Sequence, residues 1–302
     1  MDETKRDTHT EWDTSDMGAP HKIGGIGIHQ TPDGISISQK QNIDKILQKQ
    51  GLTKAQMVQM PLDPKVKIIP NPEGNNGDCS NSYAQLLGEL QFVANSTHLD
   101  IAFVVNRLVS YTANPSMQHW TAVKRILRYL SGTRDYGITY RYSPDPVTFK
   151  GYTDASYKSH NDGKSITSYI FLAAGGGITW RSGKQSITAL SSMEAEYIAL
   201  WEAGKEASWL RNLHSDLGLT QVNPMRLLSD STGALQIASN LIFHNKTKHI
   251  DPKHHWIREK IQAGRFIADY IPLEEQTADV LTKALPQPAY EIHMRSFSLA
   301  PV

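Results

Sequence analysis

Residues 148–187 have the sequence TFKGYTDASYKSHNDGKSITSYIFLAAGGGITWRSGKQSI, and this stretch decides the fold. It contains three segments rich in β-branched and aromatic residues, at 148–152, 165–174 and 177–187. Gly, Asn and Asp separate these segments, as they separate strands joined by turns. Together with residues 138–140 just upstream, the stretch therefore predicts a ladder of successive strands.

The pattern changes to helical spacing after residue 187. Apolar residues recur with that spacing over 192–217, and Gly218 stands where a helix ends. Further on, the sequence predicts a strand at 225–229, helices at 232–240 and 252–263, a strand at 265–271 and a helix at 274–285. Three strands followed by helix, strand, helices, strand and helix is the order of a mixed five-stranded α/β sheet with flanking helices.

Upstream of the ladder the chain is predicted to be mainly helical. Residues 26–37 alternate apolar and polar side chains around Pro32-Asp33-Gly34, which predicts a β-hairpin. A helix is expected at 39–50, a proline-rich linker at 61–80, and helices over 83–130 with a break at Asn114-Pro115. We expect four parts: an acidic, poorly ordered segment at 1–20, the hairpin and helices at 21–146, the mixed-sheet domain at 147–288 and a tail at 289–302.

Composition limits the class of protein. The chain has 302 residues, of which 39% are hydrophobic and 20% charged, and two globular domains are the expected number. A net charge of +1 means that any surface for a polyanion must be a local patch. The single cysteine, Cys79, excludes a disulfide framework and predicts an intracellular location, in cytoplasm or nucleus. No apolar run has the length of a membrane span, so no membrane contact is expected.

Four acids stand at the ends of predicted elements, where they could meet. Asp154 ends the first strand of the domain, Glu194 begins the long helix, Asp230 ends the fourth strand and Asp279 lies in the last helix. Neighbouring strands lie about 5 Å apart, so these side chains are expected at one edge of the sheet. Carboxylates bind hard divalent cations, and two such ions about 4 Å apart promote phosphodiester cleavage. Each acid alone is explained as well by a turn, a helix cap or a solvated face; their joint arrangement favours a metal site.

Several short motifs carry a resemblance to a known family. They are YTDA (152–155), ALSSMEAEY (189–197), DSTGA (230–234), TKHID (247–251) and EEQTADVLTK (274–283), with RILRYLSGT (125–133) and YG (136–137) upstream. Over nearly its whole length the chain resembles the C-terminal part of the Pol polyprotein of Ty1/copia-type retrotransposons, a reverse transcriptase thumb and connection followed by ribonuclease H. It departs from the family's pattern at Met193, where Thr is usual, at Ser231, where Asn is usual, and at Gly24-Gly25 in the hairpin that resembles the primer grip.

The resemblance implies a fold and an activity. It implies a ribonuclease H-like fold in which Asp154, Glu194, Asp230 and Asp279 hold two Mg²⁺ or Mn²⁺ ions and cleave the RNA of an RNA–DNA hybrid. The rest of a retroelement Pol protein is the implied protein partner, and no small-molecule cofactor is expected. The chain contains no adjacent Asp-Asp pair, so polymerase activity is not expected from it. The alternative is a catalytically silent, nucleic-acid-binding relic of a truncated element.

Basic residues give candidate contacts to nucleic acid. Lys124, Arg125 and Arg128 lie on one predicted helix with Trp120 and Tyr129. Cations beside aromatic rings can follow a phosphate backbone, although a solvated helix face explains them equally well. Lys248 and His249 in the TKHID motif are further candidates.

Three other patterns have ordinary explanations. Zinc-ligand residue types gather at His244, His249, Asp251, His254 and His255, but the adjacent His254 and His255 face different ways on a helix and no cysteine completes a site. The glycine run at 175–177 is expected to be the turn between two strands, because no Lys-Ser/Thr pair follows it into a helix. Ser191-Ser192 is expected to cap the long helix, since no nucleophile-elbow motif surrounds it.

Overall fold

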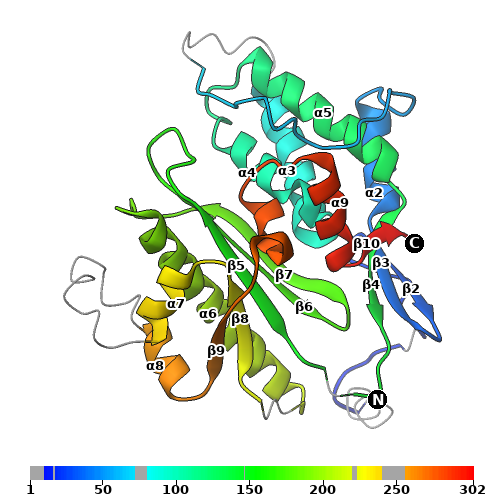
Figure 1. The fold of residues 1–302 in the computed structure, drawn as a ribbon. Coiled ribbons are helices and arrows are strands. Elements are labelled where there is room, and N and C mark those ends of the chain that lie inside the picture. Colours follow the sequence, from blue (N-terminus) through cyan, green and yellow to red (C-terminus); the bar gives the residue numbers. More distant parts are fainter. Residues whose placement is uncertain (1–9, 16–17, 72–79, 146, 220–222, 240–255) are drawn as a thin grey trace.

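The structure, a computed structural model, describes residues 10–15, 18–71, 80–145, 147–219, 223–239 and 256–302. Within these residues, two five-stranded sheets are flanked by helices (Figure 1). None of the helices described is both long enough and apolar enough to cross a membrane. The first sheet is antiparallel and has the order β1 (Lys22–Ile23), β2 (Ile26–Thr31), β3 (Gly34–Ser38), β4 (Tyr136–Arg141), β10 (Leu299–Pro301).

The second sheet is mixed, and its strand order confirms the predicted fold class. Its strands are β5 (Lys150–Ser156), β6 (Ile166–Ala173), β7 (Gly176–Lys184), β8 (Met225–Ser229) and β9 (Phe266–Tyr270), arranged β7-β6-β5-β8-β9. The first three strands are antiparallel, whereas β8 runs parallel to β5 and β9 parallel to β8. This is the mixed five-stranded sheet of ribonuclease H type that the sequence predicts.

Helices precede, interrupt and follow the second sheet. Those before it are α2 (Lys40–Lys49), α3 (Ser80–Ser96), η2 (Leu99–Ile101), α4 (Ala102–Val109) and α5 (Met117–Thr133). Those after β7 are α6 (Ser192–Asp216), α7 (Thr232–Ser239), α8 (Trp256–Gln262), η5 (Leu273–Glu275), η6 (Thr277–Leu281) and α9 (Gln287–Ser296). As predicted, Ser191 caps α6: its Oγ accepts a hydrogen bond from the Glu194 N–H at 3.1 Å. Gly218, with φ of 74°, follows the end of the helix.

Both faces of the second sheet are covered, and β6 shows how. On one face, Tyr169 and Phe171 pack with Leu200 and other residues of α6. On the other face, Ile170 belongs to a large apolar cluster that includes residues of α3, α4, α5, η6 and α9. Because successive side chains of a strand point to opposite faces, one strand serves both cores. The helical part upstream is therefore packed against the sheet and shares its core.

Two predicted elements differ from the structure. The strand at 138–140 exists as β4, but it joins the first sheet; Pro144 and Pro146, which cannot donate backbone hydrogen bonds, stand between it and β5. The helix predicted at 274–285 is wrong in type, because the region forms the 3-10 turns η5 and η6. The backbone of Gln276 leaves the helical region there (φ −72°, ψ 85°), and its side-chain amide donates to the Thr153 carbonyl on β5.

The segment 289–302, predicted to be a tail, is part of the fold. It contributes most of α9 and all of β10, which pairs with β4. The turn predicted at 175–177 is confirmed between β6 and β7, but Ala174 and Gly175 form it, both with positive φ (51° and 82°), and Gly176 and Gly177 already belong to β7. The hairpin at 26–37 is confirmed as β2 and β3. The first four residues of the helix predicted at 252–263 lie outside the described residues, and so does most of the segment 1–20.

Candidate active site

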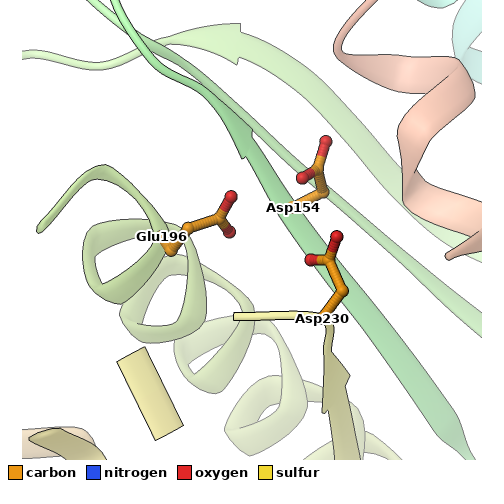
Figure 2. Close-up of side chains that lie close together, drawn as sticks. All are labelled: Asp154, Glu196 and Asp230. Carbon is orange, nitrogen blue, oxygen red and sulfur yellow. The ribbon is translucent and has the colours of Figure 1, made fainter. Parts of the chain in front are cut away.

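Three carboxylates meet at one edge of the second sheet. Asp154, Glu196 and Asp230 each offer an oxygen, and these oxygens all lie within 4.8 Å of one another. Figure 2 shows the three side chains pointing toward one another from β5, from the first turns of α6 and from the residue after β8. The group brings together residues that are up to 76 positions apart in the sequence.

Strand register explains why Asp154 and Asp230 meet. β5 and β8 are parallel neighbours, and Tyr152 pairs with Leu228. Two residues further along each strand are Asp154 and Asp230, which therefore emerge level with each other at the carboxyl ends of the strands. Asp154 is buried, whereas Asp230 lies half-buried in the turn before α7. The cap of α7 is Ser231, whose Oγ accepts from the Ala234 N–H at 3.3 Å, so Asp230 is not used as that cap.

The long helix contributes Glu196 to this group, whereas the sequence predicted Glu194. Successive residues of a helix turn by about 100°, so these two glutamates point in nearly opposite directions. The Glu194 side chain is buried at the helix start, where its Oε2 accepts the Leu190 N–H at 2.9 Å. The structure thus brings Asp154 and Asp230 together with Glu196 and leaves Glu194 in a capping role.

A signal for Glu196 exists in the sequence of α6. Its buried stripe against the sheet contains Leu200, Ala203, Ala207 and Leu210, spaced three and four residues apart. Four residues before Leu200, this stripe reaches position 196. Extending the apolar face toward the helix start would have selected Glu196, whereas counting from the cap selected Glu194.

Asp279, the fourth predicted acid, adjoins Asp154. It lies in η6, which is fixed against the sheet where Ser168 Oγ donates to the Ala278 carbonyl at 2.9 Å. The Lys283 ammonium forms an ion pair with Asp279 Oδ2 at 2.8 Å. Thr282 Oγ1 donates a 2.5 Å hydrogen bond to Asp154 Oδ2, which fixes the orientation of that carboxylate.

Burial raises the pKa values of Asp154, Glu196, Asp230 and Asp279, and neighbouring carboxylate charges add to the shift. Burial, together with the charge of Asp279, raises the pKa of Asp154 from 3.8 to about 6. Burial and the charges of Asp154 and Asp230 raise the pKa of Glu196 from 4.5 to about 10. Burial also raises the pKa of Asp230 and of Asp279, with Lys283 acting in the opposite direction at both. Such a concentration of buried and half-buried acids is unfavourable unless a cation joins it.

The donor set fits a divalent cation. Carboxylate oxygens are the ligands that Mg²⁺ and Mn²⁺ prefer. Two of these oxygens, Glu196 Oε2 and Asp279 Oδ1, are buried and have no hydrogen-bond partner among the residues described. A polar atom left unpaired in this way is costly unless something absent from the protein chain satisfies it.

The predicted basic residues on α5 have structural partners. Arg125 Nε donates to the Met60 carbonyl at 3.2 Å, and Arg128 Nε donates to the Gln56 carbonyl at 2.7 Å. Lys124 is exposed, with its ammonium 5.7 Å from the centre of the Trp120 ring. The two arginines thus hold the segment that follows α2 against α5, and their role with nucleic acid stays a prediction. Lys248, His249 and the histidines of the zinc hypothesis lie outside the described residues.

No protein-family model matches the chain, but curated proteins do. It is 36% identical to the Retrovirus-related Pol polyprotein from transposon TNT 1-94 of Nicotiana tabacum, over 95% of this chain and 22% of that protein. It is 31% identical to the Retrovirus-related Pol polyprotein from transposon RE2 of Arabidopsis thaliana, over 93% of this chain and 19% of that protein. A transposon Ty5-1 protein of Saccharomyces cerevisiae is 30% identical over 68% of this chain and 67% of its own length. The chain thus spans about a fifth of the two polyproteins.

Solved structures include ribonuclease H domains that align with about half of the chain. An N-terminal RNase H domain from Mycobacterium tuberculosis aligns with 50% of this chain and 98% of its own, with 15% identity and a TM-score of 0.31. The LC11-RNase H1, isolated from compost, aligns with 49% of this chain and 98% of its own, with 19% identity and a TM-score of 0.32. The fold assignment rests on the strand order of the second sheet.

Proposed function

The chain belongs to the Ty1/copia-type retrotransposon Pol family, and from this premise we propose that it is a ribonuclease H-type endonuclease. Its substrate is an RNA–DNA hybrid, of which it cleaves the RNA strand. It acts as one part of a larger Pol protein, since the chain corresponds to 22% of the tobacco polyprotein.

One observation carries the proposal: the carboxylates that converge on the edge of the second sheet. Asp154, Glu196 and Asp230 lie within 4.8 Å of one another, and Asp279 adjoins Asp154. We propose these four as the metal-binding acids, with Glu196 in the role that was predicted for Glu194. Two divalent ions held there would activate a water molecule and stabilise the leaving oxygen.

The protein's own residues hold this site in shape. Thr282 fixes the Asp154 carboxylate through its hydroxyl, and Gln276 anchors the η6 segment to β5 by donating to the Thr153 carbonyl at 3.0 Å. Lys283 places a positive charge beside Asp279. In the proposed reaction this ammonium also attracts the scissile phosphate toward the acids, because phosphodiesters are anionic.

Hybrid preference and lack of DNA synthesis belong to the same proposal. A site that cleaves RNA in a hybrid must contact 2′-hydroxyls and an A-like minor groove, which duplex DNA does not offer. Nucleotide addition requires a separate set of metal-binding acids, and the chain contains no adjacent Asp-Asp pair to supply them.

A nuclease assay with the purified chain tests the proposal. With Mg²⁺ or Mn²⁺, we expect cleavage of the RNA in a labelled hybrid, no cleavage of duplex DNA and no extension of a primer. Asp154→Asn keeps the shape of the side chain and removes its charge, so it should abolish cleavage while hybrid binding persists. A wild-type chain that binds hybrid but cuts it with neither metal would favour the silent relic instead. Cleavage that survives Asp154→Asn would overturn the assigned site.

A further inference from the structure

A second site lies between the helical part of the chain and the second sheet. It is a cleft of about 480 Å³, lined on one side by the segment 62–69 and Arg107 of α4, and on the other by residues 156–161 and 282–284. Lys67, Arg107 and Lys283 are its three cations, and no carboxylate lines it among the residues described. We call it the basic cleft. It begins beside the carboxylate group, because Thr282 and Lys283 contact Asp154 and Asp279.

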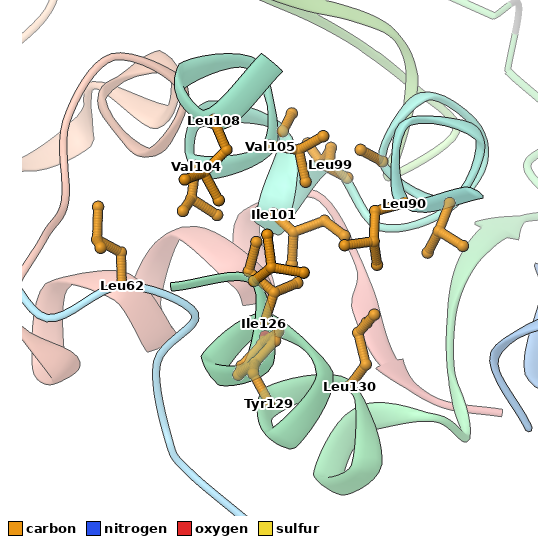
Figure 3. Packing of buried hydrophobic residues seen from close by; sticks show 14 of the residues in the cluster. Leu62, Leu90, Leu99, Ile101, Val104, Val105, Leu108, Ile126, Tyr129 and Leu130 are labelled. Carbon is orange, nitrogen blue, oxygen red and sulfur yellow. The ribbon is translucent and has the colours of Figure 1, made fainter. Parts of the chain in front are cut away.

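The segment 62–69 forms a fixed wall of the basic cleft. Leu62 and Ile68 are buried, and Figure 3 shows Leu62 in the same apolar cluster as Val104 and Leu108 of α4. Two side chains of α5 hold the backbone of the segment at 2.8 Å: Gln118 donates to the Lys67 carbonyl, and the His119 ring bonds the Ile69 carbonyl. A wall anchored in this way is preorganised, so little ordering is required when a ligand binds.

Arg107 has hydrogen-bonding capacity that the described part of the chain does not use. Its Nη2 makes two long contacts of 3.4 Å, to the Ile68 carbonyl and to Asn161 Oδ1, and its buried Nη1 has no acceptor among the residues that the structure describes. None of the carboxylates in the described part of the chain forms an ion pair with it. Arginine presents a planar fork of donors that matches a phosphate group.

The opposite wall of the basic cleft adds neutral polar groups. Ser156, the last residue of β5, lines it together with Ser159 and Asn161, and these residues lie two to seven positions beyond Asp154. Exposed apolar side chains stand on the first wall, with Val66 42% and Ile69 49% exposed. A free phosphate ion would leave these apolar groups without a partner, whereas the sugars of a nucleic-acid strand can pack on them.

We propose that the basic cleft binds a backbone phosphate of the nucleic acid whose neighbouring residues enter the carboxylate site. This inference rests on the proposed function and extends it: the helical part upstream supplies part of the substrate-binding surface of the nuclease. Arg107 and Lys67 contact the phosphate, and the strand continues past Lys283 toward Asp154. The contact is independent of base sequence, because only backbone groups are recognised.

Salt-dependent binding of a labelled RNA–DNA hybrid tests this proposal. The full chain is used with Asp154→Asn, so that binding is measured without cleavage. Arg107→Ala should weaken binding by about tenfold, as expected for the loss of a charge-assisted contact. It should also reduce the slope of log affinity against log salt by about 0.7–0.9, since one fewer counterion is released. Arg107→Lys should restore most of that slope, because it keeps the charge.

Matched variants and a folding control make the outcome decisive. Arg265→Ala removes an exposed arginine that precedes β9, at the opposite end of the parallel strands from Asp230, and should leave affinity and slope unchanged. Lys67→Ala alters an exposed side chain and should shift both quantities as Arg107→Ala does; it decides the question if circular dichroism shows that Arg107→Ala is unfolded. In the active chain, Arg107→Ala should raise KM and leave kcat near its wild-type value. This is the pattern expected when a lost contact stabilised the bound substrate and the transition state equally.

The failure of this inference differs from the failure of the proposed function. If the wild type cleaves hybrid while the Arg107 and Lys67 variants bind with unchanged affinity and slope, the basic cleft is not a phosphate site and the nuclease assignment stands. If the wild type binds no nucleic acid, both are overturned. If Arg265→Ala weakens binding as much as Arg107→Ala, the effect is one of overall charge and the inference is wrong.

Discussion

Substitutions of Glu194 and Glu196, two glutamates at the start of α6, should have different effects on the cleavage of hybrid. Glu196→Gln removes a charge from the carboxylate group, so we expect cleavage of hybrid to fall by about 100-fold or more, since loss even of groups that support metal ligands costs roughly 10–100-fold. Glu194→Gln keeps an oxygen that can accept the Leu190 N–H and should cleave hybrid nearly as well as wild type. Rates at saturating substrate, with thermal unfolding as the control, measure both. The reverse pattern would restore Glu194 to the site.

Stability of the metal-free chain should depend on pH through the same acids. An acid whose pKa is higher in the folded state than in the unfolded state destabilises the fold once it ionises. For Asp154 the effect is absent below about pH 4, grows as pH rises and is complete above its folded pKa of about 6. Glu196, with a pKa of about 10, extends the loss of stability to higher pH.

We therefore expect the unfolding temperature in the presence of a chelator to fall between pH 5 and pH 8, with a loss on the order of 2 kcal/mol. Asp154→Asn should flatten this dependence and stabilise the metal-free chain at pH 8, because the repulsion with Asp279 is removed. Mn²⁺ should raise the unfolding temperature of the wild type more than that of the variant. A wild type that becomes more stable as pH rises would contradict the clustering of ionisable acids.

At the level of helices and strands, α9 and β10 are the elements whose loss should matter most. Tyr290, Met294, Phe297 and Leu299 are buried in the cluster shared with α3, α4 and α5. Phe297→Ala should cost about 3–5 kcal/mol of unfolding free energy, the range for a large side chain deleted from a core. Ile292, which lies in α9 five residues before Phe297 and is 58% exposed, is the matched control, and Ile292→Ala should change stability by less than about 0.5 kcal/mol. Denaturant titration compares them, and equal effects would mean that α9 is not part of the core.

Sequence patterns predicted most elements of this structure but not all of their partners. Alternation and turn residues placed β5, β6 and β7, and helical spacing placed α6 to within a residue at each end. The neighbour of β4 in its sheet could not be predicted from sequence patterns. Alternation of apolar and polar residues shows that a strand has a buried and an exposed face, but it does not show which strand lies beside it. For η6, contacts of Gln276 with a distant strand override a local helical pattern.

Sequence patterns also predicted some residues of the carboxylate site and not others. Asp154 and Asp230 follow from strand ends alone, since parallel neighbours finish at one edge. The choice between Glu194 and Glu196 depends on which face of α6 meets the sheet, a fact of packing that only the buried stripe of the helix encodes. The basic cleft was not predicted at all, because its walls come from separate segments of the chain, 62–69 with Arg107 and 156–161 with 282–284, which meet only in the folded chain.

At the scale of the whole molecule, one apolar cluster contains residues from both sides of position 147, where the sequence predicts a boundary between two parts of the chain. Residues from α2, α3, α4 and α5 share it with Ile170 of β6 and with Val280 and Leu281 of η6. The Trp180 indole N–H of β7 donates to the Ala94 carbonyl of α3 at 2.8 Å, which joins the two parts further. The upstream helices therefore hold the edge of the sheet on which the carboxylates stand, and a nuclease domain cut at residue 147 would expose a face that is buried here.

Pairing of β10 with β4 also constrains how the chain can be made. Leu299 lies opposite Ile138, so the first sheet receives its last strand from residues synthesised more than 150 positions later. Hairpin β2–β3 and its pairing with β4 can form while a ribosome is still translating, but the edge of β4 stays open until residues 299–301 have emerged. Closure of that edge is a long-range step and therefore slow. During translation the nascent chain therefore carries an unpaired strand edge, whose free backbone groups can pair with a strand of another chain.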